Sequence, residues 1–209
     1  MVLRIRKWYN YWEKYVKGVV NYSLYFYTNV IYIAGSERMN IKTKRLLIRE
    51  IVSEDWKYVQ NIATDFAKSR YIIYDQPFPV EDMKVRELTK KFADLNLFFG
   101  VFLQNSPDMI GYVCFHNNDD DYDLGYCFHS DYQGKGYAFE SCLEVMRYME
   151  QNHKVKSFTA GTALINTPSC NLLKKLGFIL RETEPLSFHK DKDGFDIVFE
   201  GGHFTRVDK

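Results

Sequence analysis

The segment from Asp123 to Glu140 holds the residues whose types and spacing most clearly indicate chemistry. Gly134 and Gly136 stand between an apolar run and a helical pattern, and a glycine lets the backbone approach a ligand closely because it has no Cβ. The free N–H groups at the start of the following helix point into this turn, where an anion such as a phosphate binds well. Lys135 adds a positive charge at the rim. The alternative is a glycine-containing turn without a ligand.

Two kinds of element must position this loop. Apolar runs of strand length occupy residues 45–51, 97–103, 109–115, 123–129, 156–162, 178–181 and 195–199. Helical spacing is found from Ser53 onward, where S-E-D-W places acids in the first turn, and over 80–94, 136–151 and 167–176, with Gly177 ending the last helix. A meander of strands followed by strand–helix–strand–helix–strand predicts an α+β fold, with a mixed sheet and helices on both faces.

Composition and motifs exclude several classes of protein. The chain has 209 residues, and its 46% of apolar residues is enough to form a core, which excludes disorder as its main character. A formal net charge of +1 lacks the positive excess of a protein that coats nucleic acid, so we predict no nucleic-acid partner. The glycine loop matches neither G-x-x-x-x-G-K-[ST] nor G-x-G-x-x-G, which gives no support for nucleotide hydrolysis or for a dinucleotide oxidoreductase.

Four cysteines are far apart in the sequence and lie among apolar neighbours. They form no C-x-x-C pair, and no histidine lies at zinc-ligand spacing from them. We therefore predict reduced, buried thiols, no metal and a cytoplasmic location. These cysteines are Cys114, Cys127, Cys142 and Cys170.

Residues 1–38 differ in composition from the rest of the chain, because they are rich in aromatic residues and contain only two acids. Apolar residues from Trp8 to Val20 recur at three- and four-residue steps, which indicates one apolar stripe on a helix. The uncharged stretch 18–36 is long enough to cross a bilayer, but polar residues interrupt it. Three interpretations stay open: a membrane anchor, a packing or oligomer-forming appendage, or upstream sequence that is not native, with Met39 as the start. The main domain is predicted to occupy 39–209.

Motifs in a fixed order resemble those of a known enzyme superfamily. Q-x-x-G-x-A, at Gln133, Gly136 and Ala138, is similar to the acetyl-coenzyme A signature of the GNAT acyltransferases. N-x-x-S followed by L-G-F, within 166–178, is similar to an element of the Rim-type branch, which acetylates ribosomal-protein amino termini and other amines. The opening T-K-R-L-L-I-R at 43–49 and Gly125-Tyr126 also match that branch. The resemblance covers about residues 41 to 200.

The resemblance implies a mostly antiparallel sheet of about six to seven strands that splays into a V, with the pantetheine arm of acetyl-CoA in the gap. The pyrophosphate would lie on the backbone amides of residues 134–138, and Asn166 and Ser169 would line the far wall. Ser169 is equally suited to be the N-cap of its helix. The residues so assigned to acetyl-CoA are Cys127, Phe128, His129, Gln133, Gly134, Lys135, Gly136, Tyr137, Ala138, Asn166 and Ser169.

The reaction that the resemblance implies is attack of a neutral amine on the thioester carbonyl, which needs a base. Asp123 is the first candidate because it lies ten residues before Gln133, close to where histone-acetylating relatives carry their catalytic glutamate. If residues 117–122 form a simple hairpin tip, His116 lies opposite Asp123, and the two share a proton or a bridging water. The alternative is an exposed acid with no role in catalysis.

Two further tasks are stabilisation of the oxyanion and of the departing thiolate. A backbone N–H near Cys127 or Phe128 would serve the first. Many relatives use a tyrosine as the acid for the second, but the matching residue here is Leu173, which cannot donate a proton. Ser169 is the substitute that Rim-type enzymes suggest, and a thiolate can also leave without a dedicated acid.

The acceptor site is expected along residues 69–78, where tyrosines stand beside an acid. Tyr71, Tyr74 and Asp75 suit an amine through cation–π and charge attraction, although they would serve equally well in packing. We predict an acetyl-CoA-dependent N-acetyltransferase acting on a protein N-terminus or a small-molecule amine, as a monomer or homodimer. The alternative is a catalytically impaired binding module of the same fold.

Overall fold

The computed structural model describes residues 39–76, 78–118 and 121–207, so the predictions for residues 1–38 lie outside the described part. The described chain forms one eight-stranded sheet in the order β1-β2-β3-β4-β5-β6-β8-β7. Its strands are β1 (Asn40–Lys42), β2 (Leu46–Glu50), β3 (Phe98–Leu103), β4 (Met109–Asn118), β5 (Asp121–Phe128), β6 (Ser157–Ala163), β7 (Ile179–Leu186) and β8 (Phe199–Val207).

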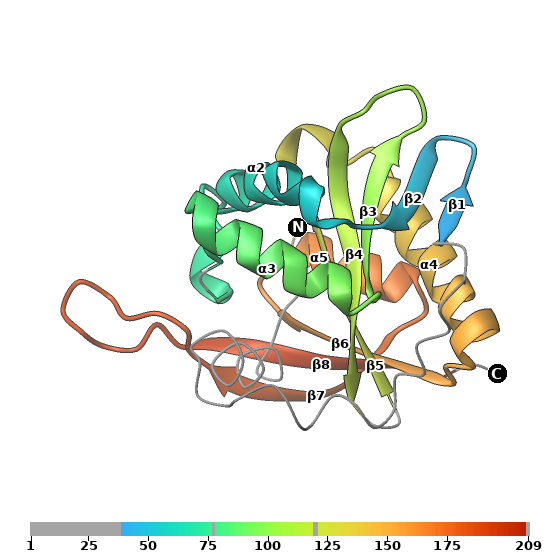
Figure 1. Cartoon of the computed structure of the whole chain (residues 1–209). Helices are drawn as coiled ribbons and strands as arrows, with labels where there is room; N and C mark the ends of the chain where they lie inside the picture. Colours follow the sequence, from blue (N-terminus) through green and yellow to red (C-terminus); the bar gives the residue numbers. More distant parts are fainter. Residues whose placement is uncertain (1–38, 77, 119–120, 208–209) are drawn as a thin grey trace, which may run out of the picture.

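Helices cover both faces of the sheet, which confirms the predicted α+β architecture. In Figure 1, α2 (Trp56–Phe66) and α3 (Asp82–Asp94) lie in front of the sheet, and α4 (Tyr137–His153) and α5 (Thr167–Lys175) lie behind it. Short 3-10 turns are η1 (Ser53–Asp55), η2 (Ile72–Tyr74) and η3 (Ser130–Tyr132). Among the described residues, the helices are too short or too polar to cross a membrane.

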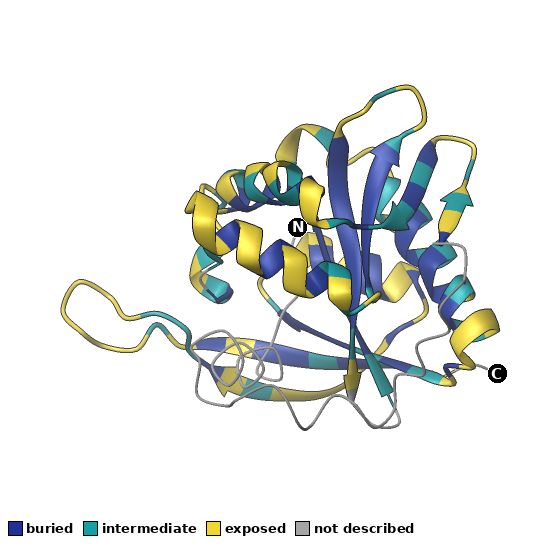
Figure 2. Cartoon of the chain, viewed as in Figure 1, coloured by how far each residue is buried: buried dark blue, intermediate teal, exposed yellow. Residues whose placement is uncertain are grey.

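The sheet separates two apolar cores, one under each pair of helices. Apolar residues at helical spacing on α2, such as Val59, Ile62 and Phe66, pack with those of α3 against one face. Cys142, Val145 and Met149 of α4 pack with residues of α5 against the other face. In Figure 2 the residues coloured as buried follow the central strands, whereas the connection between β7 and β8, residues 187–198, projects outward and is largely exposed.

The predicted V lies between β5 and β6. These strands pair in parallel through only two residue pairs, Tyr122↔Phe158 and Asp123↔Thr159. Beyond Asp123, β5 stays paired with β4 as far as Phe128, and β6 stays paired with β8. The two strands therefore diverge toward their C-terminal ends, whereas all other neighbouring strands in the sheet are antiparallel.

The strand predictions are wrong in three respects. The sheet has eight strands rather than six or seven, because β1 precedes the first predicted strand and is too short to show a pattern. The sequence predicts strands at 178–181 and 195–199, but β7 continues to Leu186 and β8 begins only at Phe199. Two adjacent glycines, Gly201 and Gly202, are unfavourable in a strand, so the sequence pattern does not indicate the strand β8 at this position. In the structure a Cβ on Gly201 would come within 2.5 Å of Leu186, so close packing explains that glycine.

Candidate active site

The turn between β5 and α4 adopts a conformation that its glycines allow. Gly134 (φ 73°) and Gly136 (φ 80°) both have positive φ, a region that residues with a Cβ rarely enter. Gly136 is the N-cap of α4, so the first N–H groups of this helix, which have no partner inside it, point out of its N-terminus. The positive end of the helix dipole lies at the same place, and the arrangement is one that binds anions.

An arginine from β2's N-terminal flank holds this turn in place. Arg45 donates from Nε to Glu140 Oε2 (2.7 Å) and from Nη1 to the backbone oxygen of Lys135 (2.9 Å), and its guanidinium lies 4.6 Å from the centre of the Tyr137 ring. Thr43 donates to the other oxygen of Glu140. Burial raises the pKa of Glu140, but the hydrogen bonds from Thr43 and Arg45 and the charge of Arg45 outweigh it, and the pKa lies below its ordinary value.

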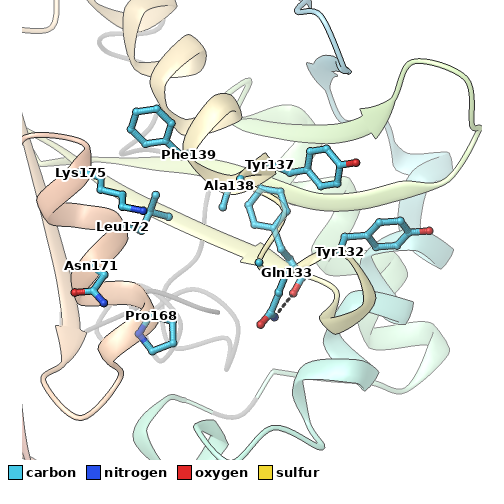
Figure 3. Close-up of a pocket in the computed structure, with 12 residues that line it drawn as sticks. Tyr132, Gln133, Tyr137, Ala138, Phe139, Pro168, Asn171, Leu172 and Lys175 are labelled. Atoms are coloured by element: carbon cyan, nitrogen blue, oxygen red, sulfur yellow. Dashed lines mark hydrogen bonds between the residues drawn. The ribbon is translucent and has the colours of Figure 1, made fainter.

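A cavity of about 410 Å³ opens beside the glycine turn. In Figure 3 the first turn of α4 and one side of α5 face each other across it. Gln133 Nε2 donates to the Phe128 backbone oxygen at 2.8 Å and so fixes the turn to the end of β5. Of the residues predicted to bind acetyl-CoA, six line the cavity: Phe128, Gln133, Gly134, Gly136, Tyr137 and Ala138.

The opposite wall of this cavity comes from α5, but it is lined by other residues than the predicted Asn166 and Ser169. Pro168, Leu172 and Lys175 give this wall an apolar surface with one cation. The spacing of seven residues between Pro168 and Lys175 would place both on one face of a helix, and this signal was available from the sequence. Anion-binding amides on one side and apolar side chains on the other fit a diphosphate joined to a pantetheine arm.

Three predicted cofactor residues point their side chains elsewhere. The Lys135 ammonium donates to the backbone oxygen of Asp131 at 2.8 Å and does not line the cavity. The His129 ring lies against α2, where Nε2 is 3.8 Å from Asp65 Oδ1. A third, Cys127, packs its side chain into the core under α2 and α3. The side chains of these three residues are therefore turned away from the cavity.

The start of α5 is capped by Asn166, and the prediction that Ser169 is the cap is wrong. Asn166 Oδ1 accepts from the backbone N–H of Ser169 at 3.3 Å. The Ser169 hydroxyl is fully buried and lies 2.8 Å from the hydroxyl of Tyr126 on β5. Leu173, at the position where many relatives have tyrosine, is also fully buried and belongs to the core under α4 and α5.

Asp123 lies opposite His116 in the β4–β5 ladder, as the hairpin prediction requires. Asp123 is not the exposed acid of the alternative, because it is only 8% exposed and accepts from the Thr159 hydroxyl at 2.9 Å. It lines an open cleft of about 90 Å³ together with His203 of β8. The cleft therefore brings together Asp123 of β5 and His203 of β8, two titratable residues that the sequence analysis did not connect. His203 Nε2 also lies 2.8 Å from Glu184 Oε1 of β7.

The backbone of β5 supplies a donor to the V. The N–H of His129 donates to the backbone oxygen of Ile110 on β4. Since alternate residues of an antiparallel strand bond to the same neighbour, the N–H of Cys127 also faces β4, whereas the N–H of Phe128 faces the gap toward β6. Of the two backbone donors predicted for the oxyanion, Phe128 is therefore the one placed to serve.

The predicted acceptor residues lie across the mouth of the V. Tyr71, Tyr74 and Asp75 line a small cavity with Thr162 and Asn166, at the end of β6. Asp75 is 5% exposed, and its backbone oxygen lies 2.7 Å from His189 Nε2, which fixes the segment to the β7–β8 connection. The ring of Tyr74 packs edge-on against Phe199 at 5.4 Å, so packing explains part of this wall.

Gln76 is a further polar residue of this wall that the sequence analysis missed. Its side chain is 8% exposed, and its Nε2 has no hydrogen-bond partner among the described residues. It lines a small cavity shared with Asp75 and with Cys127 of β5. A buried N–H group without a partner costs free energy, so a group that accepts from it is favoured there.

Comparison with known proteins identifies the family. The model of the Acetyltransferase (GNAT) domain matches residues 45–179. The chain belongs to the GNAT acetyltransferase family. It is 33% identical over 141 residues to the uncharacterized N-acetyltransferase YnaD of Bacillus subtilis (66% of this chain, 82% of that protein). It is 26% identical over 166 residues to the ribosomal protein uS5-alanine N-acetyltransferase of Escherichia coli (70% and 81%).

A solved GNAT structure shares the fold. The RimL ribosomal L7/L12 α-N-protein acetyltransferase in complex with coenzyme A superposes with a TM-score of 0.67 at 15% identity, over 81% of this chain and 98% of that one. These relatives place the chain in the Rim-type branch of the GNAT family, as an acetyl-CoA-dependent acyltransferase. Within residues 39–76, 78–118 and 121–207 of this GNAT protein, no group of three or more His, Cys, Asp or Glu side chains is placed to hold a metal ion.

Proposed function

We propose that this GNAT protein transfers an acetyl group from acetyl-CoA to a primary amine by direct attack, with a protein N-terminus or a small-molecule amine as acceptor. The observation that carries the proposal is the glycine turn at the N-terminus of α4, which opens into the 410 Å³ cavity beside the V. The relative named for uS5-alanine acetylation and the RimL structure with coenzyme A support both the donor and the class of acceptor.

The chain's own groups divide the work of binding the donor. The amides of residues 134–138 bind the diphosphate, and Lys175 adds a positive charge on the opposite wall. The apolar side chains of Leu172 and Pro168 contact the pantetheine arm. When bound, acetyl-CoA supplies a carbonyl carbon activated as a thioester. The Phe128 N–H donates to the carbonyl oxygen as negative charge develops on it.

Asp123 accepts the proton that the acceptor's ammonium must lose before its nitrogen can attack. Its burial and its bond from Thr159 hold the carboxylate in one orientation at the edge of the cleft, and His116 stands opposite as a partner for relay through water. In the transfer the C–N bond forms and the C–S bond breaks. The ammonium proton passes to Asp123 and then to solvent before the attack. After the attack the nitrogen loses its second proton to solvent by the same route as the amide forms, and the bonding pair of the broken C–S bond stays on sulfur.

A second function is favoured by one observation, the leucine at position 173. Because Leu173 is buried in the core and carries no proton, the chain lacks the acid that many relatives use. The second candidate is therefore a module that binds acetyl-CoA without transferring the acetyl group.

A thiol-release assay separates the two functions. The full chain is incubated with acetyl-CoA and a panel of amines: a peptide with N-terminal alanine, the same peptide with its N-terminus blocked, a diamine and a free amino acid. We expect release with at least one free amine and none with the blocked peptide. Binding of acetyl-CoA by calorimetry without release from any amine would leave only the binding module.

We also propose that residues 39–209 form the acetyltransferase domain and that the protein works in the cytoplasm. Met39 is buried against the core under α4 and α5, so the domain begins there or earlier. All four cysteines are buried free thiols, as predicted, and free thiols persist in a reducing compartment.

A further inference from the structure

The hydrogen bond between Tyr126 and Ser169 joins the two arms of the V. Tyr126 is on β5, and Ser169 is in the first turn of α5, which follows β6. Their hydroxyl oxygens are 2.8 Å apart, and both side chains are completely or almost completely buried. The pair lies in a surrounding core of leucine, cysteine and methionine, where two bonded hydroxyl groups are unusual, and Ser169 directly follows Pro168, which lines the 410 Å³ cavity.

We propose that Tyr126 is a positioning residue, which donates to Ser169 and thereby directs and polarises the Ser169 O–H toward the sulfur of coenzyme A. The inference rests on the proposed function and extends it to a residue that takes over the task left by Leu173. The tyrosine that many relatives carry on this helix is here replaced by a tyrosine from the neighbouring strand, acting through a serine.

The direction of the bond follows from the two hydroxyl groups. A phenol is a stronger acid than an alkyl alcohol, so Tyr126 is the better donor and Ser169 the better acceptor. Burial raises the pKa of Tyr126 well above its ordinary value, which keeps its proton in place. The titratable groups that act on it are Cys142 of α4 and Cys170 of α5, whose own pKa values burial also raises, so both are neutral thiols near neutral pH.

The pair acts by hydrogen bonding rather than by giving up a proton. A thiol is a far stronger acid than an alkyl alcohol (the cysteine side chain has a pKa of about 8.5), so a serine hydroxyl is too weak an acid to protonate a thiolate fully. When the C–S bond breaks, the bonding pair stays on sulfur, and the Ser169 O–H donates to it. Because Tyr126 donates to the same oxygen, the two bonds strengthen each other. Tyr126 and Ser169 both keep their protons throughout.

The test measures the thiol of bound coenzyme A rather than turnover. Calorimetry gives the affinity of the full chain for coenzyme A, and for an analogue with hydrogen in place of the thiol, from about pH 6 to about pH 10, a range that covers the ionisation of an alkyl thiol. If the pair stabilises the thiolate by one pKa unit, the affinity for coenzyme A relative to the analogue rises about fivefold to tenfold with pH. The charges of Asp123, His116 and Lys175 act on both ligands alike, so their effect cancels in the ratio.

Tyr126→Phe keeps the ring and removes the hydroxyl, and we expect it to reduce this rise to less than about twofold. Ser169→Ala should do the same, and the double variant should be no worse than Ser169→Ala alone. Tyr122→Phe, on the same strand and half-buried, is the matched control and should behave as wild type. Thermal unfolding shows that each variant is folded.

A wild-type pH dependence in folded Tyr126→Phe would overturn the proposal and leave the bond a structural one. A protein that shows the rise but acetylates no amine would contradict the proposed function without touching this inference. Loss of the rise in Ser169→Ala but not in Tyr126→Phe would mean that Ser169 acts without Tyr126.

Discussion

At the scale of single residues, Asp123 is a buried acid at the edge of an open cleft. Asp123→Asn keeps the shape of the side chain and its bond with Thr159 but removes the base. We expect kcat to fall about 100-fold or more, a loss typical of a missing general base, while acetyl-CoA affinity stays unchanged. Steady-state kinetics and calorimetry on the same preparation measure both quantities.

Asp108→Asn is the matched control for this variant, since Asp108 is an exposed acid in the β3–β4 turn. It should leave kcat as in wild type. Wild-type turnover in Asp123→Asn would show that Asp123 is not the base. His203, which lines the same cleft, would then be the next candidate.

Gln76 offers a second test at this scale, because its replacement is expected to maintain or raise the stability of the fold while weakening the binding of the acceptor amine. Gln76→Met removes a buried N–H group that has no partner among the described residues. We expect the free energy of unfolding to stay the same or rise by about 1 kcal/mol, while the KM for the acceptor amine increases. Chemical denaturation and acceptor titration measure the two effects. A lower stability with an unchanged KM would show that Gln76 has a structural role alone.

Part of the site could be predicted residue by residue. Gly134 and Gly136 were predictable because positive φ favours glycine, and the pairing of Asp123 with His116 followed from a simple hairpin. His203 and Tyr126 were not identified, because their partners are distant in sequence. Gln76 was not identified because its burial depends on tertiary packing. The direction in which Lys135 points was not predictable for the same reason, since a flexible side chain has several acceptors within reach.

At the scale of elements, the contact between β2's flank and α4 positions the glycine turn. Arg45→Ala removes the two hydrogen bonds to Glu140 and Lys135 that fix the turn. Because Arg45 is partly exposed, we expect a modest effect, a rise in the acetyl-CoA Kd of about threefold to fivefold. Arg147→Ala, which breaks an ion pair further along α4, is the control and should not change the Kd.

The contact of Thr43 and Arg45 with Glu140 predicts that the free energy of unfolding depends on pH. The pKa of Glu140 lies below its ordinary value of 4.5 in the folded protein. Its contribution to stability is therefore present above pH 4.5 and is lost as the pH falls through the lower, folded pKa. We expect the stability difference between wild type and Glu140→Gln to shrink as the pH falls below 4.5. An unchanged difference down to pH 3 in thermal unfolding would contradict the assignment.

Element positions were predictable where a long periodic pattern was present. The α4 and α5 ranges were placed within about two residues, because apolar spacing, the preceding glycine turn and the terminal Gly177 all agree. The bounds of β7 and β8 were not predictable from pattern alone. β7 is an edge strand whose polar residues face solvent, and Gly201 of β8 is required by packing against Leu186 rather than by a turn.

At the scale of the whole molecule, the V lies where the two halves of the sheet meet, between β5 and β6. Both halves belong to the proposed domain, residues 39–209. Met39 is 5% exposed and packs in the core under α4 and α5. We expect a chain that begins at Met39 to unfold cooperatively and to bind acetyl-CoA with the affinity of the full chain. Calorimetry on both chains checks this, and a truncated protein that is folded but fails to bind would assign residues 1–38 a part in the site.

The most direct measurement is a calorimetric titration of acetyl-CoA into wild type and Gly136→Glu. The substitution places a negative charge at the N-terminus of α4, where the diphosphate is expected, and forces a side chain into positive φ. Gly194→Glu is the control, because Gly194 also has positive φ but lies in the exposed β7–β8 connection. The structure predicts binding by wild type and Gly194→Glu and none by Gly136→Glu. Equal affinity in all three would contradict the assignment of the glycine turn as the diphosphate site.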